Sequence, residues 1–292
     1  MTEVFTTLAS LSVLVFVIGS MASMGLSLQL HQITTSLRNT RLVIMALLAN
    51  FVLVPLVAYG ITLLFPLDEP LRIGLILLST AAGAPFLPKL AETAKGNTAF
   101  SVGLMVLLMV VTIIYLPLVL PLLLSGVAVN PWEIAQSLIL LMLLALTLGL
   151  VINARYEEMA ARLQPVFSQA SNTALMLLLV LGLVLNFREM ISLVDSFGIM
   201  AAALFLLLSL AVGYLLGGSE GQTKSVMGLG SGQRNIAAAL VVTGQNFGID
   251  VITYLMVVAI LGLSILMPLA GELGKRRRSV PDQALEGDLP VG

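Results

Sequence analysis

The sequence alternates between long apolar runs and short polar segments. Because about 20 apolar residues cross the hydrocarbon core of a bilayer, each long run is a candidate transmembrane helix. Hydrophobic residues make up 59% of the 292 and charged residues only 10%, whereas a soluble domain has about 25% charged residues. The pattern therefore predicts an all-α, polytopic membrane protein. The expected spans lie at about residues 9–28, 43–65, 71–93, 99–124, 131–153, 168–187, 197–217, 225–247 and 251–269.

Two of these apolar runs contain residues that break a helix. In the third run, residues 83–85 read Gly-Ala-Pro, and in the eighth, a glycine cluster precedes Gln233, Arg234 and Asn235. A glycine weakens a helix by about 1 kcal/mol, and a mid-membrane arginine costs roughly 2.5–3.5 kcal/mol on insertion scales. Irregular backbone is tolerated at membrane depth only where protein or a water-filled cavity satisfies it. We therefore expect breaks at residues 83–85 and 230–232, and we expect both to line a site.

The two breaks occupy corresponding places in two halves of the chain. Spans one to four and six to nine pair as two units of opposite topology, with span five as the connector. Paired interrupted spans in inverted halves point to the binding site of a secondary transporter. Half-helices that begin at Pro85 and at about Arg234 would direct N–H groups and positive dipole ends into this site. The pattern thus predicts an inverted repeat that moves a small organic anion.

Lysine and arginine residues outside the spans gather on one predicted side of the membrane. This side is the cytoplasmic one, because cytoplasmic loops carry the excess of these residues. We therefore expect residues 1–8 outside, a disordered cytoplasmic tail at 272–292, and a place in the bacterial inner membrane. The basic residues on the cytoplasmic side are Arg38, Arg41, Lys89, Lys95, Arg155, Arg162, Lys224, Lys275, Arg276, Arg277 and Arg278, against Arg72 and Arg188 on the other side.

Composition argues against several other classes of function. The chain has no cysteine and one histidine, so thiol chemistry is excluded and a zinc or di-iron site is not expected. A net charge of −1 implies no nucleic-acid surface. A membrane enzyme would need a Ser–His, di-acidic or His-rich set within the spans, and none is visible. We expect no enzymatic activity and no cofactor other than sodium, with the lipid bilayer and a transported solute as partners.

Four short stretches together resemble the bile acid:sodium symporter family of secondary transporters. The resemblance runs from about residue 24 to residue 269 and follows the family's order. Residues 24–28 (Met-Gly-Leu-Ser-Leu) are similar to the family's Met-Gly-Leu-Thr-Leu, and residues 50–55 (Asn-Phe-Val-Leu-Val-Pro) to its Gln-Phe-x-x-x-Pro. Residues 96–102 (Gly-Asn-Thr-Ala-Phe-Ser-Val) are similar to Gly-Asn-x-Ala-Leu-Ser-Val, and residues 230–235 occupy the place of Glu-x-Gly-x-Gln-Asn.

The resemblance implies a core domain that moves against a panel domain. The core would comprise residues 43–124 and 197–269, the panel residues 9–28 and 131–187, and the whole transmembrane domain residues 9–271. The two broken helices would cross in the core, and the substrate would bind where the crossing meets the panel. The expected substrate-binding residues are Ala84, Pro85, Gly232, Gln233, Arg234 and Asn235.

The family's sodium sites are altered at several carried-over positions. Asn50, Ser101, Ser231 and Gln233 keep oxygen atoms and are the candidate sodium ligands. Leu87 and Pro88 stand where the family has Ser-Asn, Met105 replaces a Thr, Gly230 replaces the charged Glu, and Arg234 falls at a Gln. An arginine nearby repels a cation by about 4 kcal/mol at 4 Å with an effective dielectric constant of 20. We hypothesise that sodium coupling is weakened or lost, with the Arg234 guanidinium in place of the ion.

Three questions stay open at the level of the sequence. Arg234 either shapes the electrostatics of a substrate site or caps carbonyl groups of the broken helix. The transporter could retain sodium coupling through altered ligands. The chain could also be a non-transporting binding or sensor protein on the same scaffold, since lost ion ligands are what such a protein would show.

Overall fold

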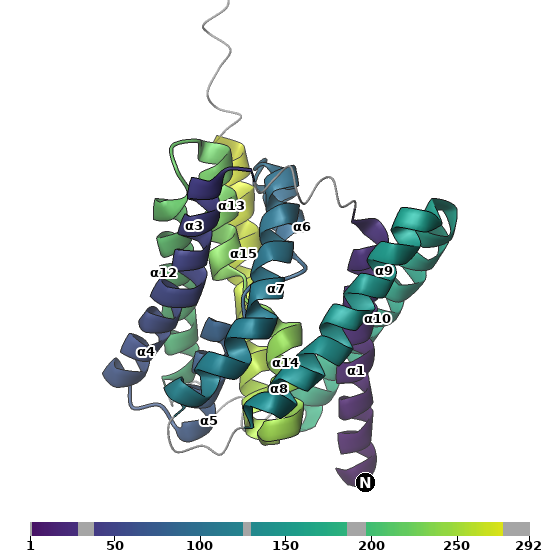
Figure 1. Ribbon diagram of the computed structural model, residues 1–292. Coiled ribbons are helices and arrows are strands. Elements are labelled where there is room, and N and C mark those ends of the chain that lie inside the picture. Colours follow the sequence, from purple (N-terminus) through teal and green to yellow (C-terminus); the bar gives the residue numbers. More distant parts are fainter. Residues whose placement is uncertain (1, 29–37, 125–129, 186–196, 277–292) are drawn as a thin grey trace, which may run out of the picture.

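The computed structural model describes residues 2–28, 38–124, 130–185 and 197–276, and within these ranges every regular element is helical (Figure 1). Two of the elements are short π-helical turns, η1 and η2, inside longer helices. The elements are α1 (Thr2–Ser27), α3 (Thr40–Leu48), η1 (Ala49–Leu53), α4 (Val54–Leu64), α5 (Glu69–Thr80), α6 (Leu87–Thr93), α7 (Thr98–Leu123), α8 (Pro131–Leu138), η2 (Ile139–Leu143), α9 (Leu144–Arg155), α10 (Glu157–Leu185), α12 (Gly198–Leu216), α13 (Gly221–Gly232), α14 (Ile236–Asn246) and α15 (Ile249–Arg276).

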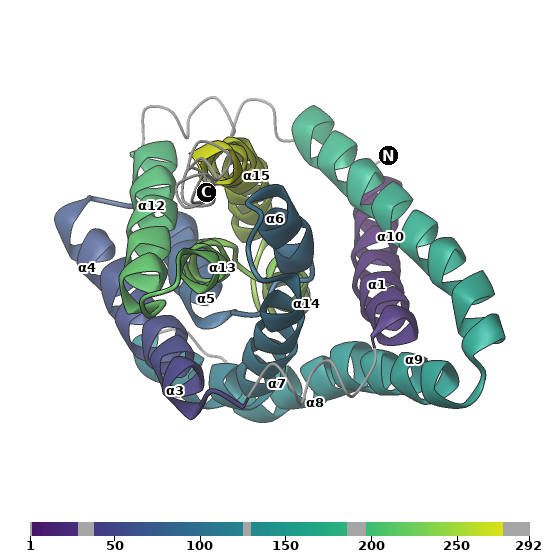
Figure 2. The same cartoon turned by 90° about the horizontal axis from the view of Figure 1, so that it is seen from above.

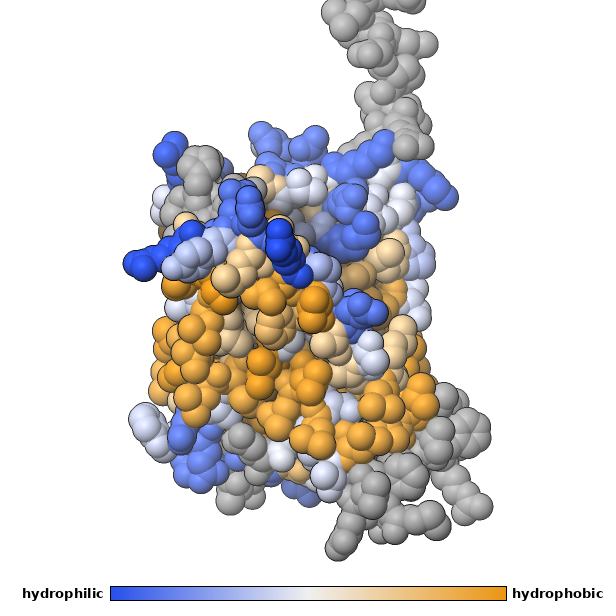
Figure 3. Space-filling model, turned by 90° about the vertical axis from the view of Figure 1, so that its right-hand side faces the viewer, coloured by the Kyte–Doolittle hydropathy of each residue, from blue (hydrophilic) through white to orange (hydrophobic). Residues whose placement is uncertain are grey.

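The arrangement confirms an all-α, multi-pass membrane protein. Six helices are long and apolar enough to cross a bilayer: Ser10–Ser27, Thr40–Leu64, Thr98–Leu123, Pro131–Arg155, Gly198–Leu216 and Ile249–Arg276. The other predicted spans correspond to α10, to the pair α5 and α6, and to the pair α13 and α14. A broad apolar band lies between hydrophilic upper and lower rims on the face shown in Figure 3. Such a band matches the hydrocarbon core of a membrane.

Three helices extend beyond their predicted spans. α1 begins at Thr2 rather than residue 9, α10 begins at Glu157 rather than residue 168, and α15 continues to Arg276. The expectation that residues 272–276 belong to a disordered tail was therefore wrong, whereas the side of the membrane on which residues 1–8 lie stays a prediction. An apolar run in the sequence marks only the part of a helix that lies inside the hydrocarbon core. The helical backbone hydrogen bonds continue past the ends of that run. Residues 277–292, most of the expected tail, lie outside the described residues, as do Arg188 and the end of span six.

The helices α1, α9 and α10 pack closely against one another (Figure 2). A Cβ atom on Gly25 of α1 would lie 2.3 Å from the carbonyl oxygen of Leu146, and one on Gly149 of α9 would lie 2.6 Å from that of Ala22. Glycine at both positions lets the two backbones touch, as small residues do at membrane helix interfaces. The helices α6 and α12 contact both α13 and α15, α7 contacts α13, α5 and α14 contact α15, and α14 also contacts α1. The division into core and panel domains stays a prediction.

The span from Thr40 to Leu64 is not a uniform α-helix. A π-helical turn, η1, interrupts it at Ala49–Leu53. The Tyr115 hydroxyl of α7 donates a hydrogen bond to the carbonyl oxygen of Phe51 at 2.6 Å. π-bulges free backbone groups and redirect side chains, and they are frequent at functional sites. Here the bulge carries Asn50, which is fully buried.

Candidate functional site: a crossing of two broken helices

The first break, predicted at residues 83–85, lies between α5 and α6 at residues 81–86. Gly83 adopts a positive φ of 79°, a conformation that glycine adopts at no steric cost. A Cβ atom at this position would lie 2.2 Å from the backbone nitrogen of Met109 in α7. Thr112 satisfies the freed backbone of Ala82, because its hydroxyl donates to the carbonyl oxygen at 3.1 Å and accepts from the N–H at 3.0 Å. The chain therefore crosses against α7 without unpaired groups at Ala82.

The second break lies three residues later than its sequence suggests. α13 continues through Gly232, and the chain becomes extended only at Gln233. The prediction of a break at residues 230–232 was wrong, because the glycines of α13 serve close packing instead. A Cβ atom on Gly228 would lie 3.1 Å from the carbonyl oxygen of Leu210, and one on Gly232 would lie 3.2 Å from the Leu210 Cβ atom in α12. Tertiary packing thus overrides the low helix propensity of glycine.

Asn235 ties the two breaks together. Its backbone N–H donates to the carbonyl oxygen of Ala81 at 2.9 Å, and its side-chain amide donates to that of Gly83 at 3.0 Å. Its side-chain oxygen accepts from the N–H of Ala238 at 3.1 Å and so caps the start of α14. One buried residue therefore positions the first break and starts the second half-helix.

Arg234 is 2% exposed, and its guanidinium lies within the crossing. Nε donates to the carbonyl oxygen of Leu78 at 2.9 Å, and a terminal nitrogen donates to that of Ser79 at 2.7 Å. The other terminal nitrogen donates to Asn50 Oδ1 at 2.8 Å and to the carbonyl oxygen of Ser231 at 3.1 Å. All four hydrogen bonds end on neutral carbonyl oxygens. The side chain therefore joins α5, α13 and η1 without an acidic partner among them.

The position of these carbonyl groups at helix ends explains why the crossing stabilises a positively charged group. Leu78 and Ser79 lie in the last turn of α5, and Ser231 lies in the last turn of α13. The last carbonyl groups of a helix lack intrahelical partners and carry the negative end of the helix dipole. Two such ends converge on the guanidinium, which supplies both N–H donors and positive charge.

Asn50 completes this polar network. Its Nδ2 donates to the Ser231 hydroxyl and to the carbonyl oxygen of Ala46, both at 3.0 Å. Its Oδ1 is the acceptor for Arg234. Two of the four candidate sodium ligands, Asn50 and Ser231, thus lie beside each other, and both are hydrogen-bonded within the network that holds the guanidinium.

Two other carried-over sodium positions, Gly230 and Leu87, lie in apolar contact with each other. A Cβ atom on Gly230 would lie 3.1 Å from Leu87 Cδ2 and 3.3 Å from Leu104 Cδ2. Leu87 and Met105 are each 1% exposed. Ser101 bonds within its own helix, since its hydroxyl donates to the carbonyl oxygen of Thr98 at 2.6 Å. Hydrocarbon side chains therefore surround Gly230, the position where the family has a carboxylate.

The six expected substrate-binding residues divide into two groups. Ala84, Gly232, Arg234 and Asn235 are buried, whereas Pro85 and Gln233 are partly exposed. The Gln233 side chain has no hydrogen-bond partner among the described residues. Sequence reasoning missed Phe86, which is 37% exposed beside Pro85. It also missed Thr112 and the α5 carbonyl groups, since a backbone acceptor has no signature in sequence.

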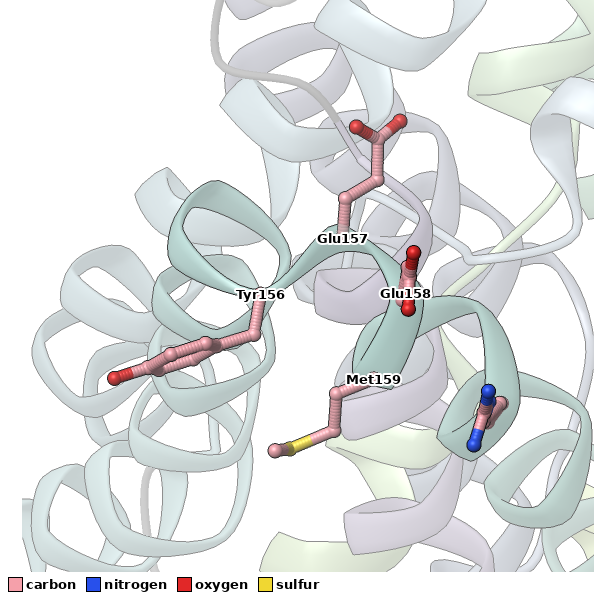
Figure 4. A pocket seen from close by; sticks show the side chains of 5 residues that line it. Tyr156, Glu157, Glu158 and Met159 are labelled. Atoms are coloured by element: carbon pink, nitrogen blue, oxygen red, sulfur yellow. The ribbon is translucent and has the colours of Figure 1, made fainter.

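A hollow at the surface lies at the turn between α9 and α10, and none of the crossing residues lines it (Figure 4). Tyr156, Glu157, Glu158, Met159 and Arg162 line it. These residues are all exposed and belong to the polar end of the two helices. No cluster of three or more metal-ligating side chains occurs among the residues that the structure describes. The crossing therefore remains the candidate functional site.

A model of the "Sodium Bile acid symporter family" matches residues 13–193, which is more than half of the chain. The chain belongs to this family. The match includes the first broken helix and η1, and it ends before α13 and α14. Arg234 and Asn235 therefore lie outside the matched segment.

Curated relatives share similarity over about half of the chain. An "Uncharacterized sodium-dependent transporter YocS" of Bacillus subtilis is 28% identical over 147 residues, covering 49% of this chain and 44% of that protein. A "Probable sodium/metabolite cotransporter BASS3, chloroplastic" of Arabidopsis thaliana is 27% identical over 149 residues, covering 51% of this chain and 35% of the relative. The matched segments thus span less than half the length of these relatives. The family and these relatives are transporters rather than enzymes.

Proposed function

We propose that the chain is a secondary transporter that moves a small organic anion by alternating access and does not require sodium. The observation that carries this proposal is the guanidinium of Arg234 between the ends of α5 and α13. A covalently attached cation fills the space among these carbonyl groups and stays with the protein through every transport cycle. It cannot be released to drive transport, as a co-transported ion is.

Preference for an anion follows from the charges at the crossing. The described part of the chain gives Arg234 no ion pair, so only the partial negative charges of the carbonyl ends of α5 and α13 oppose its positive charge. At about 8 Å with an effective dielectric constant of 20, a full positive charge attracts an anion by roughly 2 kcal/mol, which is the upper limit for this site. The start of α14, immediately after Asn235, adds the positive end of a helix dipole. A carboxylate is the simplest organic group that matches this field.

Loss of sodium binding follows from the atoms that surround two groups of the carried-over sodium positions. In the group of Asn50 and Ser231, the side-chain oxygen of Asn50 and the backbone carbonyl oxygen of Ser231 already accept hydrogen bonds from Arg234. In the group of Gly230 and Leu87, the side chains of Leu87 and Leu104 approach Gly230. Sodium needs several oxygen ligands, as hard cations generally do. Neither group offers such a set.

Gln233 is the polar residue best placed to contact the substrate, because it is partly exposed and its side chain has no partner among the described residues. Gln233→Ala is expected to raise the KM for transport at least fivefold. The thermal unfolding midpoint should change little, since no hydrogen bond is lost. Initial uptake rates into vesicles, measured against substrate concentration, provide the test. An unchanged KM would remove Gln233 from the substrate site.

We also propose that the end of the molecule with the C-terminus of α15 faces the cytoplasm of a bacterium. The helices α6, α9, α13 and α15, which carry Lys89, Arg155, Lys224 and Arg276, each end or begin at this upper side of Figure 1. Their gathering on one side supports this orientation.

A second candidate function is sodium-coupled symport of an organic anion. The names of the relatives favour it, because two of them are described as sodium-dependent or as sodium cotransporters. In that case the ion would bind away from the network of Arg234. Uptake in the presence and absence of sodium separates the two candidates.

The proposal is tested with purified protein in vesicles. A thermal-shift screen first identifies a binding carboxylate from a panel that includes taurocholate and pyruvate, since a ligand of the folded state raises the unfolding midpoint. Uptake of the radiolabelled carboxylate is then measured in sodium and in choline buffers. We expect rates within twofold of each other. A tenfold stimulation by sodium would reject sodium independence, and binding without any uptake would indicate a sensor instead.

A further inference from the structure

An exposed groove runs between α1 and α10, and it contains polar side chains at membrane depth. Gln169 and Thr173 are four residues apart and therefore share one face of α10. Both are exposed, and neither side chain has a hydrogen-bond partner among the residues that the structure describes. The groove is lined by Leu8, Leu11, Ser12, Val15, Val166, Gln169, Ala170, Thr173, Ala174 and Leu177.

The groove faces away from the crossing. On α1, Val13, Val17 and Met21 are buried, and α1 lies between α10 and α14 (Figure 2). Leu11 and Val15 lie on another side of α1 and are 53% and 45% exposed. The contact between α1 and α10 forms the floor of the groove, where Ser12 and Ala174 are 4% and 6% exposed, and it continues to Ser171, whose hydroxyl donates to the carbonyl oxygen of Phe16. The exposed side chains above this floor are an outer surface of the molecule.

Gln169 and Thr173 place two exposed polar side chains in a mostly apolar groove, and these side chains favour a polar partner. Lipid tails can cover Leu11, Val15 and Val166, but they offer nothing to the donors and acceptor of the Gln169 amide. A primary amide carries two N–H donors and one oxygen acceptor, so it can pair with another copy of itself. The exposed Ala170 lies beside it, and small residues allow two membrane helices to approach closely.

We propose that this groove is an interface between two copies of the chain. A two-fold axis parallel to the membrane normal would bring the same surface of both copies together, as in most symmetric dimers. The Gln169 amides would bond across the axis to each other or to Thr173, and the exposed leucine and valine side chains would pack around them. The interface leaves the crossing of each copy uncovered, because it lies on the opposite side of α1.

The absence of cysteine from the natural sequence makes this proposal directly testable. Thr173→Cys in the full-length protein, reconstituted in vesicles at low protein-to-lipid ratio, is oxidised and analysed under denaturing conditions. The matched control is Ile114→Cys on α7, where the natural side chain is 64% exposed on a different helix. We expect a disulfide-linked dimer at Thr173→Cys at least five times as abundant as at Ile114→Cys. Equal yields at both positions would indicate random collision and would overturn the proposal.

A second variant tests the role of the amide. Gln169→Leu keeps the volume of the side chain and removes its hydrogen-bonding groups. In single-molecule photobleaching of labelled protein in vesicles, natural Gln169 should give mainly two-step traces, and the variant should lose at least half of them. Single-step traces for the natural protein at every protein-to-lipid ratio would show that lipid alone covers the groove, and would reject the dimer.

Discussion

Arg234→Ala is expected to lower the free energy of unfolding by at least about 3 kcal/mol and to abolish transport. The substitution leaves the carbonyl groups of Ser79 and Ser231, and Asn50 Oδ1, without the donor that satisfies them, whereas the carbonyl oxygen of Leu78 keeps the N–H of Ala81 at 3.2 Å. Each buried acceptor left unpaired costs about 1–3 kcal/mol. Thermal unfolding in a fixed detergent, followed by uptake from vesicles, measures both effects.

Comparing Arg234→Lys with Arg234→Ala separates the effect of the positive charge from that of the guanidinium geometry. It keeps the positive charge, but one ammonium group cannot reproduce the planar fork that contacts carbonyl groups from α5, α13 and η1. We expect a stability between those of Arg234→Ala and the natural protein, with transport below a tenth of the natural rate. Natural stability in both variants would contradict a structural role for the guanidinium.

Gly83→Ala is expected to lower the free energy of unfolding by more than about 4 kcal/mol. The positive φ of 79° alone costs an alanine roughly 1–2 kcal/mol. The added methyl group would also lie 2.2 Å from the backbone nitrogen of Met109, and the backbone of α7 cannot rotate away as a side chain can. The expected result is a large loss of monodisperse protein, measured by size-exclusion chromatography of membrane extracts.

Gly60→Ala provides the matched control. Gly60 lies within α4, and nothing approaches a Cβ atom built at this position within 4 Å. Alanine there should leave stability unchanged or raise it by up to about 1 kcal/mol, because alanine favours the helix more than glycine. If Gly83→Ala and Gly60→Ala give equal yields of monodisperse protein, the close contact at Gly83 does not set the position of the first break.

The lengths of the apolar runs in the sequence predicted the membrane spans well, because every spanning helix must be long enough to cross the hydrocarbon core. The first break followed from Gly83 and Pro85, whose backbone preferences are local. The second break was placed too early because Gly228 and Gly232 pack against Leu210 of α12. Such a contact depends on which helices become neighbours, and glycine alone does not distinguish a break from a close approach.

The role of Arg234 shows where sequence reasoning stops. Its burial within a membrane span was evident from the sequence, and so was its need for partners. The partners themselves are mostly backbone carbonyl groups at the ends of α5 and α13, and any residue type supplies these. The sequence left two hypotheses for Arg234, one in which it shapes the electrostatics of the site and one in which it caps carbonyl groups. The observed position of the guanidinium is compatible with both. The guanidinium caps two helices and places a fixed charge one residue from Gln233.

The most direct test of the account compares sodium with choline in thermal unfolding. Natural protein and Arg234→Ala are each heated in matched sodium chloride and choline chloride over the same concentration range. If the guanidinium occupies the place of an ion, the natural protein should unfold at the same temperature in both salts. The Arg234→Ala variant should be stabilised by sodium alone, because the freed carbonyl groups can then bind it. A sodium-specific rise in the unfolding temperature of the natural protein would contradict the account.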